Sequence, residues 1–212
     1  MTIDRPTTLP PSWAESLLRL ILRKEDRDSV SGDLLEEYRE AIVPVLGAKA
    51  NRWYIRQVAG YVLRATWAWG VLVAAICVWR YLLDTLAPIH YTPGVIAFRS
   101  AVMSWALMAT FSGCGAWHAW RTGHLRAGVL LALIAATIGG YLGMAGTLLC
   151  LAVSHGPETM AAIEGSGGLF EGFPGVPLLL MIASVITSTP GAIVGRVMAA
   201  IYGWSRPNTK SA

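Results

Sequence analysis

Long apolar stretches fill most of the chain after residue 60 and predict membrane-spanning helices. A helix needs about 20 apolar residues to cross a bilayer. Four segments meet this length: residues 61–83, 100–120, 127–152 and 176–195. The first is long enough only if Arg64 and Arg80, near its two ends, extend to opposite interfaces. The pattern therefore predicts an all-α membrane protein whose body is a four-helix transmembrane bundle.

The first 60 residues follow a different pattern, which predicts a small helical module. A first helix is expected to open at Ser12, with Ser12 as N-cap and Glu15 completing a capping box. A second is expected over residues 28–43, because its apolar residues recur at every fourth position. These residues are Val30, Leu34, Tyr38 and Ile42. A third helix is expected to begin near Ala48 and to continue into the first span. The predicted organisation is a helical domain over 1–60, four spans within 61–204 and a tail over 205–212.

Composition and charge orient these elements relative to a membrane. Only 14% of the residues are charged, against about 25% in soluble domains. If the N-terminus lies inside, fifteen of the 17 Lys and Arg residues fall on the cytoplasmic side, and only Arg80 and Arg99 fall outside. By the positive-inside rule, both termini are expected in the cytoplasm, with the body in a bacterial inner membrane.

Small residues recur at helical spacing in two of the predicted spans. Gly139 and Gly143 form one G-x-x-x-G pattern, and Gly191 and Gly195 form another. Such rows let helix backbones approach closely in lipid. They favour a self-contained bundle; the alternatives are a homo-oligomer face or a docking face for a larger membrane protein. Pro190 is expected to kink the fourth span.

Few residues suggest chemistry. Cys114 and His118 lie four positions apart on one helix face, a spacing that suits two metal ligands, but no second pair accompanies them. His90 and His155 are expected near the outer ends of spans. His118 and His124 are expected near the inner ends, which matches bis-histidine haem binding only weakly. No nucleotide, protease or hydrolase motif is found. We therefore expect no catalytic, cofactor or metal residue, no enzyme activity and no nucleic-acid partner.

Two motifs in the first module carry a family resemblance. PPSWAESLLRLIL is followed by a charged break, then by GDLLEEYRE, and then by ANRWYIRQV leading into a span. This order resembles the permease prefix domain, of the second type, at the N-terminus of bacterial duplicated orphan ABC-transporter permeases. The matching residues are Gly32, Asp33, Leu34, Glu36, Glu37, Trp53, Tyr54 and Gln57, and the resemblance covers about residues 9–64. Full permeases of that class continue into a large extracytoplasmic domain, whereas this chain continues into short-looped spans. The resemblance therefore implies a stand-alone prefix protein and carries no transport activity with it.

The acidic helix face within GDLLEEYRE has three interpretations. Its residues are Asp33, Glu36, Glu37 and Glu40. The face is solvated, or it docks a basic cytoplasmic partner, or it forms ion pairs with Arg52 and Arg56 on the third helix. Ion pairing within the module is the preferred interpretation, with Gly32 allowing a close approach of Trp53 or of the backbone of the third helix.

Three functions follow as hypotheses. The first is a non-enzymatic accessory or regulatory component of an ABC-type transport system, with the lipid bilayer and a permease or other membrane protein as partners. The second is a small autonomous transporter or oligomeric channel-like protein. The lack of Asp, Glu and Lys in the middle of the spans disfavours it. The third is a membrane redox or haem-binding protein.

Overall fold

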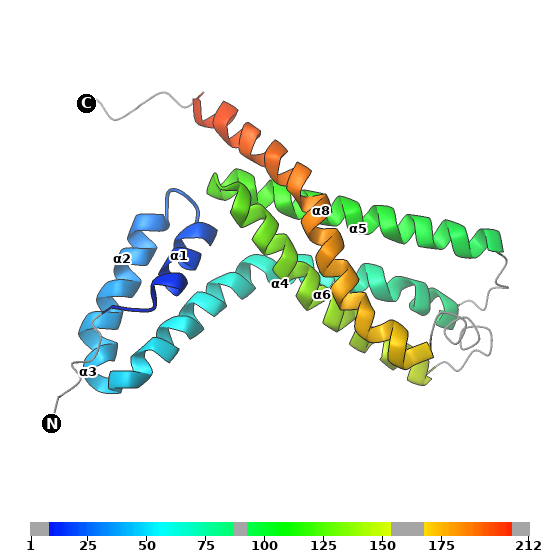
Figure 1. The fold of residues 1–212 in the computed structure, drawn as a ribbon, viewed down its shortest axis with the longest axis horizontal. Helices are drawn as coiled ribbons and strands as arrows, with labels where there is room; N and C mark the ends of the chain where they lie inside the picture. Colours follow the sequence, from blue (N-terminus) through cyan, green and yellow to red (C-terminus); the bar gives the residue numbers. More distant parts are fainter. Residues whose placement is uncertain (1–8, 87–92, 154–167, 205–212) are drawn as a thin grey trace.

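The computed structural model describes residues 9–86, 93–153 and 168–204, and every regular element within them is helical (Figure 1). The N-terminal part holds α1 (Ser12–Ile21), α2 (Arg27–Glu37), a π-helical turn (Tyr38–Ile42), α3 (Val43–Leu46) and a 3₁₀ turn (Gly47–Lys49). Four long helices follow: α4 (Ala50–Leu86), α5 (Pro93–Thr122), α6 (Leu125–Val153) and α8 (Gly168–Trp204). The all-α prediction is confirmed for this part of the chain.

The helix α1 begins differently from the capping-box prediction, which is wrong. Ser12 is the first helical residue, Pro11 occupies the N-cap position, and no side chain caps the helix. The carbonyl of Pro11 instead accepts the N–H groups of Ala14 and Glu15. The carboxylate of Glu15 pairs with Arg19 one turn further along, at 3.1 Å, so it stabilises the helix through this pair and not through the cap.

The helix α2, the π-helical turn and α3 form one rod whose buried face changes register midway. The buried residues along its first part are Ser31, Leu34 and Tyr38. The next buried residue is Val43, and Ile42 of the predicted apolar stripe is half-buried beside it. The π turn supplies the extra residue, because the N–H of Val43 donates to the carbonyl of Tyr38, five positions earlier. Pro44 accounts for the place of this turn, since it has no N–H with which to continue the α-helical pattern.

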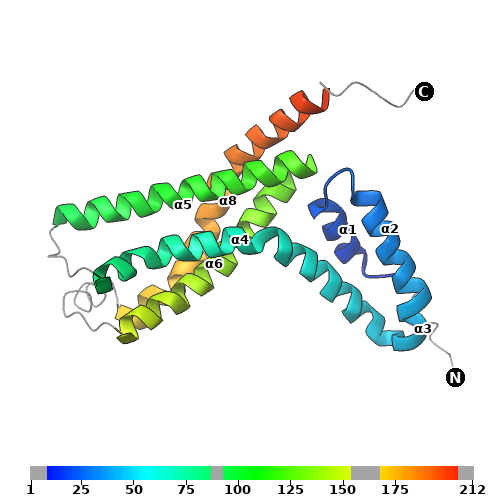
Figure 2. The ribbon, with the colours of Figure 1, turned by 180° about the vertical axis from the view of Figure 1, so that it is seen from behind.

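The third predicted helix and the first predicted span are one continuous helix. The helix α4 has 37 residues, roughly 55 Å along its axis. Figure 2 shows that it bends in its middle part. There the hydroxyl of Thr66 donates to the carbonyl of Val62 at 2.9 Å, a bond that is known to bend helices. The first half of α4 completes the N-terminal unit, called the head below, and the second half belongs to the bundle.

The second half of α4 packs with α5, α6 and α8 in a bundle of four helices (Figure 1). The most extensive interfaces join α4 to α6 and α5 to α8, and α6 also contacts α5 and α8. The head, the turn between α5 and α6, and the end of α8 lie at one end of the bundle (Figures 1 and 2). Successive long helices therefore run in opposite directions.

Glycines form the interface between α4 and α6. A Cβ atom added at Gly139 would lie 2.6 Å from Cγ1 of Val73, and one added at Gly143 would lie 2.9 Å from Cβ of Cys77. Both distances are shorter than van der Waals contact. Any side chain at these two positions would therefore push α6 away from α4.

The second glycine pair lies between α8 and α5. A Cβ atom at Gly191 would collide with the backbone of Ser112, and one at Gly195 would collide with the backbone of Ala116. Both G-x-x-x-G patterns thus lie at interfaces within this chain. The expected kink at Pro190 does not interrupt α8, which continues to Trp204.

Hydroxyl side chains are buried among the apolar core residues of the bundle, and large apolar side chains cover its outer surface. Buried hydroxyl residues between the helices include Thr66, Thr110, Ser184 and Ser188. Exposed apolar residues include Trp67, Trp105, Leu149, Leu179 and Ile186. The large apolar side chains on the outer surface differ from the polar surface of a soluble domain and suit a lipid environment. Within Arg27–Trp79, Leu125–Val153 and Gly175–Tyr202, the chain has helices long and apolar enough to cross a membrane.

The helix α5 covers the second predicted span but is not among the helices of the described chain that combine sufficient length and hydropathy. Its Ser, Thr and Trp residues lower its hydropathy. Two of its hydroxyl groups are nevertheless bonded inside the bundle. Thr110 donates to the carbonyl of Ala106 at 2.8 Å, and Ser112 donates to the carbonyl of Thr187 on α8 at 2.8 Å. These two hydroxyl groups lower the hydropathy of α5, but they need no water because carbonyl groups of the bundle accept their hydrogen bonds.

Candidate functional site

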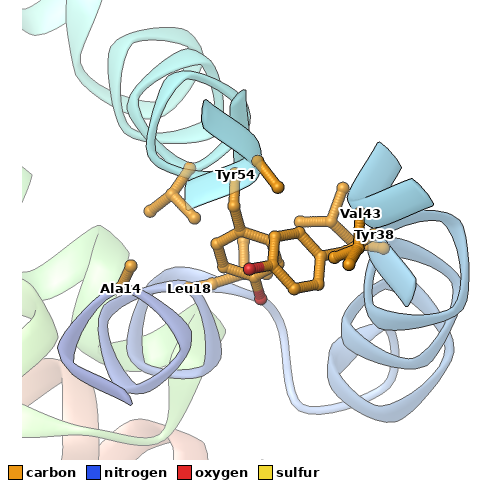
Figure 3. Close-up of a cluster of buried hydrophobic side chains, with 8 residues drawn as sticks. Ala14, Leu18, Tyr38, Val43 and Tyr54 are labelled. Carbon is orange, nitrogen blue, oxygen red and sulfur yellow. The ribbon is translucent and has the colours of Figure 1, made fainter. Parts of the chain in front are cut away.

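A cluster of apolar side chains joins α1, the α2–α3 rod and the start of α4 (Figure 3). Its buried members are Ala14, Leu18, Leu34, Tyr38, Val43, Ala50, Tyr54 and Val58. The rings of Tyr38 and Tyr54 meet edge to face, with centroids 5.5 Å apart and planes at 80°. The hydroxyl of Tyr38 also donates to Oδ1 of Asn51 at 2.6 Å. Because an aromatic pair adds about 0.5–1.5 kcal/mol beyond its buried area, these contacts hold the rod against α4.

The eight residues that carry the family resemblance divide into a core group and a surface group. Leu34 and Tyr54 are buried in the head cluster, and Trp53 packs against it half-buried. The exposed members are Gly32, Asp33, Glu36, Glu37 and Gln57. Leu34, Trp53 and Tyr54 therefore hold the head together, whereas the charged members form part of its surface.

The expected ion pairs between the acidic face and α4 are not found among the described residues. The four carboxylates, from Asp33, Glu36, Glu37 and Glu40, are all exposed. The ion pair that does join two described residues is the one between Glu15 and Arg19. Arg52 and Arg56 are exposed as well. The preferred interpretation is therefore wrong, because the rod turns its apolar face, with Tyr38 at the centre, toward α4.

The predicted close approach at Gly32 is also wrong. A Cβ atom added at Gly32 would meet no atom within 4 Å. Trp53 packs against the head cluster instead.

The head docks on the bundle through Arg27 at the start of α2. Its Nη2 donates to the carbonyl of Thr122, the last residue of α5, at 3.2 Å. The hydroxyl of Thr122 donates to the carbonyl of His118 at 2.8 Å and accepts the N–H of His124 at 3.2 Å. Gly123 completes this turn with a φ of +73°. A cationic side chain of the head thus binds the turn between two helices of the bundle.

An apolar groove of about 450 Å³ lies between α1, the middle of α4 and α6. Its lining residues are Trp13, Leu17, Ile55, Val58, Ala59, Val62, Leu63, Ile134 and Ile138. Trp13 is more than half exposed, while Ala14, Leu18 and Ile21 are the residues of α1 that are buried. The helix α1 therefore presents apolar side chains both to the head core and to the groove beside the bundle.

The candidate ligand residues do not form a metal site within the described residues, where no group of three His, Cys, Asp or Glu side chains comes together. Cys114 is fully buried in an apolar cluster with side chains of α4 and α6. The ring of His118 is buried and leaves its Nε2 without a hydrogen-bond partner among the described residues. His90 and His155 lie outside the described residues.

Sequence reasoning missed the contact between the head and the α5–α6 turn. Arg27 and Thr122 are 95 positions apart, and neither residue belongs to a motif. The position of Arg27 at the start of a helix does not by itself indicate a contact with a distant turn. The pairing depends on how the head is oriented on α4, which the chain pattern does not specify.

No protein-family model matches this chain, and no curated protein and no solved structure is similar to it. The resemblance to permease prefix domains is therefore carried by the motif residues alone.

Proposed function

We propose that this chain is a four-span membrane protein with its head and both termini in the cytoplasm. Four spans are supported by the packing of α5, which lies along α6 in the opposite direction and along α8 in the same direction. A helix packed in this way lies at the same depth in the membrane as the helices beside it. The cytoplasmic assignment is supported by the basic residues at the head end of the bundle: Arg64, Arg121, Arg126 and Arg196.

In this arrangement the head is a docking platform for a basic cytoplasmic segment of a partner protein. The observation that carries the proposal is the acidic face of α2, whose carboxylates are exposed and form no ion pair with another described residue. The face is carried by a head that α4 and the Arg27–Thr122 bond attach to the bundle. A fixed array of like charges near a membrane steers and orients an oppositely charged partner.

The class of partner comes from the resemblance. The GDLLEE and WYIRQ motifs are similar to those of permease prefix domains, so an ABC-type permease or an associated membrane protein is the expected partner. No residue of the described structure suggests a reaction, and the proposed role is accessory or regulatory.

The test is affinity purification of the full chain from bacterial membranes in mild detergent, with identification of the proteins that co-purify. The decisive variant carries Asp33→Asn, Glu36→Gln and Glu37→Gln, which remove charge while preserving side-chain size. The matched control carries Asp26→Asn and Asp28→Asn, the same chemical change near the start of α2.

A partner that co-purifies with the unmodified chain and the control, but is lost from the variant, supports the docking proposal. Co-purification of an ABC-transporter component supports the expected class. A clean homo-oligomer without partners, or a partner that the triple variant retains, contradicts the docking role.

A further inference from the structure

The contact between the head and the α5–α6 turn brings positively charged groups together. The guanidinium of Arg27 lies on this turn, where Nη2 donates to the carbonyls of Thr122 at 3.2 Å and Leu22 at 3.4 Å. Its Nε is buried and has no hydrogen-bond partner among the described residues. The side chain therefore uses only part of its hydrogen-bonding capacity within the protein.

His124 adds a second basic group, and its position is fixed by the turn itself. Its N–H is bonded to the hydroxyl of Thr122, and it directly precedes the first residue of α6, Leu125. The free N–H groups in the first turn of α6 lie directly after it, and such groups favour anions.

Arg196 adds a third basic group, from α8. A Cβ atom at Gly128 would lie 3.0 Å from Cβ of Ala192, so α8 crosses α6 at this level. Arg196 is one helical turn beyond Ala192, and His124 is one turn before Gly128, so both lie on the same side of the crossing. The exposed side chain of Arg196 can therefore extend toward the turn.

The charges acting on His124 are consistent with this placement. Partial burial, followed by the positive charges of Arg27 and Arg196, lowers the pKa of His124. Three basic groups from three separate elements thus share one corner, where a bound anion would offset the charges of the two arginines and favour the protonated form of His124.

The surroundings place this corner at the depth of lipid headgroups. On the last turns of α5, the ring centroids of Trp117 and Trp120 are 5.6 Å apart. The ring centroid of Trp120 is 6.5 Å from that of Tyr202 on α8. The guanidinium of Arg121 lies over the ring of Trp117 at 5.4 Å, so it is engaged next to the corner and not within it. Trp and Tyr gather at the boundary between membrane and water, and basic pockets between helices on the cytoplasmic side bind anionic headgroups.

We propose that Arg27, His124 and Arg196 form a binding site for a phosphate group, the headgroup phosphate of an anionic phospholipid or a free phosphate. Arginine side chains bind phosphate through paired N–H groups. An occupied site joins the head to both α6 and α8. This inference does not depend on the acidic face or on the partner proposed above.

The test uses the purified full chain in a neutral detergent and measures the dissociation constants of phosphatidylglycerol, phosphatidylcholine and inorganic phosphate. We expect saturable binding of phosphatidylglycerol in preference to phosphatidylcholine. Retention of that lipid against millimolar inorganic phosphate assigns the site to the membrane. Displacement by phosphate, together with saturable phosphate binding, assigns it to a soluble ligand.

Arg196→Gln and His124→Gln are the decisive variants, because Arg27→Gln also removes the bond that docks the head. Loss of one charge-assisted hydrogen bond is expected to weaken binding by about tenfold or more for Arg196→Gln. Arg52→Gln, an exposed position on α4 within the head, is the matched control and should bind as the unmodified chain does. The proposal is overturned if Arg196→Gln and His124→Gln bind within twofold of the control, or if the unmodified chain binds neither phosphatidylglycerol nor phosphate.

Discussion

The two tyrosines at the centre of the head differ in the hydrogen bonding of their hydroxyl groups. The hydroxyl of Tyr38 is bonded to Asn51, whereas the hydroxyl of Tyr54 is buried without a partner among the described residues. A buried hydroxyl that forms no bond loses its hydration without compensation. The ring of Tyr54 therefore stabilises the fold through packing, whereas its unbonded hydroxyl group lowers the stability of the fold.

Substituting each tyrosine by phenylalanine separates these contributions. Tyr38→Phe should lower the free energy of unfolding by about 1 kcal/mol, because it also leaves Asn51 without its donor. Tyr54→Phe should leave the free energy unchanged or raise it. Thermal unfolding of the full chain in mild detergent, followed by near-ultraviolet circular dichroism, measures both. A larger loss for Tyr54→Phe than for Tyr38→Phe would contradict the described hydrogen bonds.

The ring of His124 reports the charges at the head–bundle contact. Arg196→Gln should raise the pKa of His124, because removing a nearby positive charge stabilises the protonated imidazole. Titration of the imidazole signals by nuclear magnetic resonance measures the change. Arg52→Gln should leave the titration as it is. An unchanged pKa of His124 in Arg196→Gln would show that the Arg196 side chain does not extend toward the turn.

Among the elements, the long helices depend on glycine at their crossings and not elsewhere. The backbone of Ala116 is so close to Gly195 that no Cβ atom fits. Gly60, in the first half of α4, has no atom within 4 Å of an added Cβ. The same substitution therefore has opposite consequences at these two positions.

Gly195→Ala should destabilise the bundle by about 1–3 kcal/mol, because α5 and α8 must separate to admit the methyl group. Gly60→Ala should stabilise the chain by about 0.5–1 kcal/mol, because alanine loses less conformational freedom in a helix. The midpoint of thermal unfolding in detergent compares the two variants. Equal shifts in the same direction would be incompatible with the close α5–α8 crossing.

For the whole molecule, four antiparallel helices require the head, the α5–α6 turn and the end of α8 to share one side of the membrane. Alkaline phosphatase, which is active only outside the cytoplasm, should therefore be inactive when fused after Lys210. The same reporter should be active when inserted near Glu164, in the predicted outer loop. An active fusion after Lys210 would contradict the proposed arrangement of four spans with both termini in the cytoplasm.

The hydrophobic pattern was sufficient to predict the helices and the continuity of α4. Buried helix faces place apolar residues at helical spacing, and lipid contact requires long apolar runs. The pattern did not indicate the π turn before Pro44, which buries Val43 beside the half-buried Ile42. It also assigned the acidic face to internal ion pairs, because charge opposition in sequence does not reveal which faces meet. The Arg27–Thr122 contact, finally, depends on the three-dimensional orientation of the head, to which no local spacing corresponds.

The unbroken helix α4 fixes the rotation of the head as well as its distance from the bundle. One residue inserted between the two halves of α4 would rotate the head by about 100° around the helix axis. That rotation would carry Arg27 away from Thr122 and turn the acidic face in another direction. Seven inserted residues would restore the direction to within about 20° but raise the head by roughly 10 Å. The number of residues in the connecting stretch of α4 therefore sets the direction that the head faces around the helix axis. Insertions or deletions within this stretch are tolerated only if they preserve that direction.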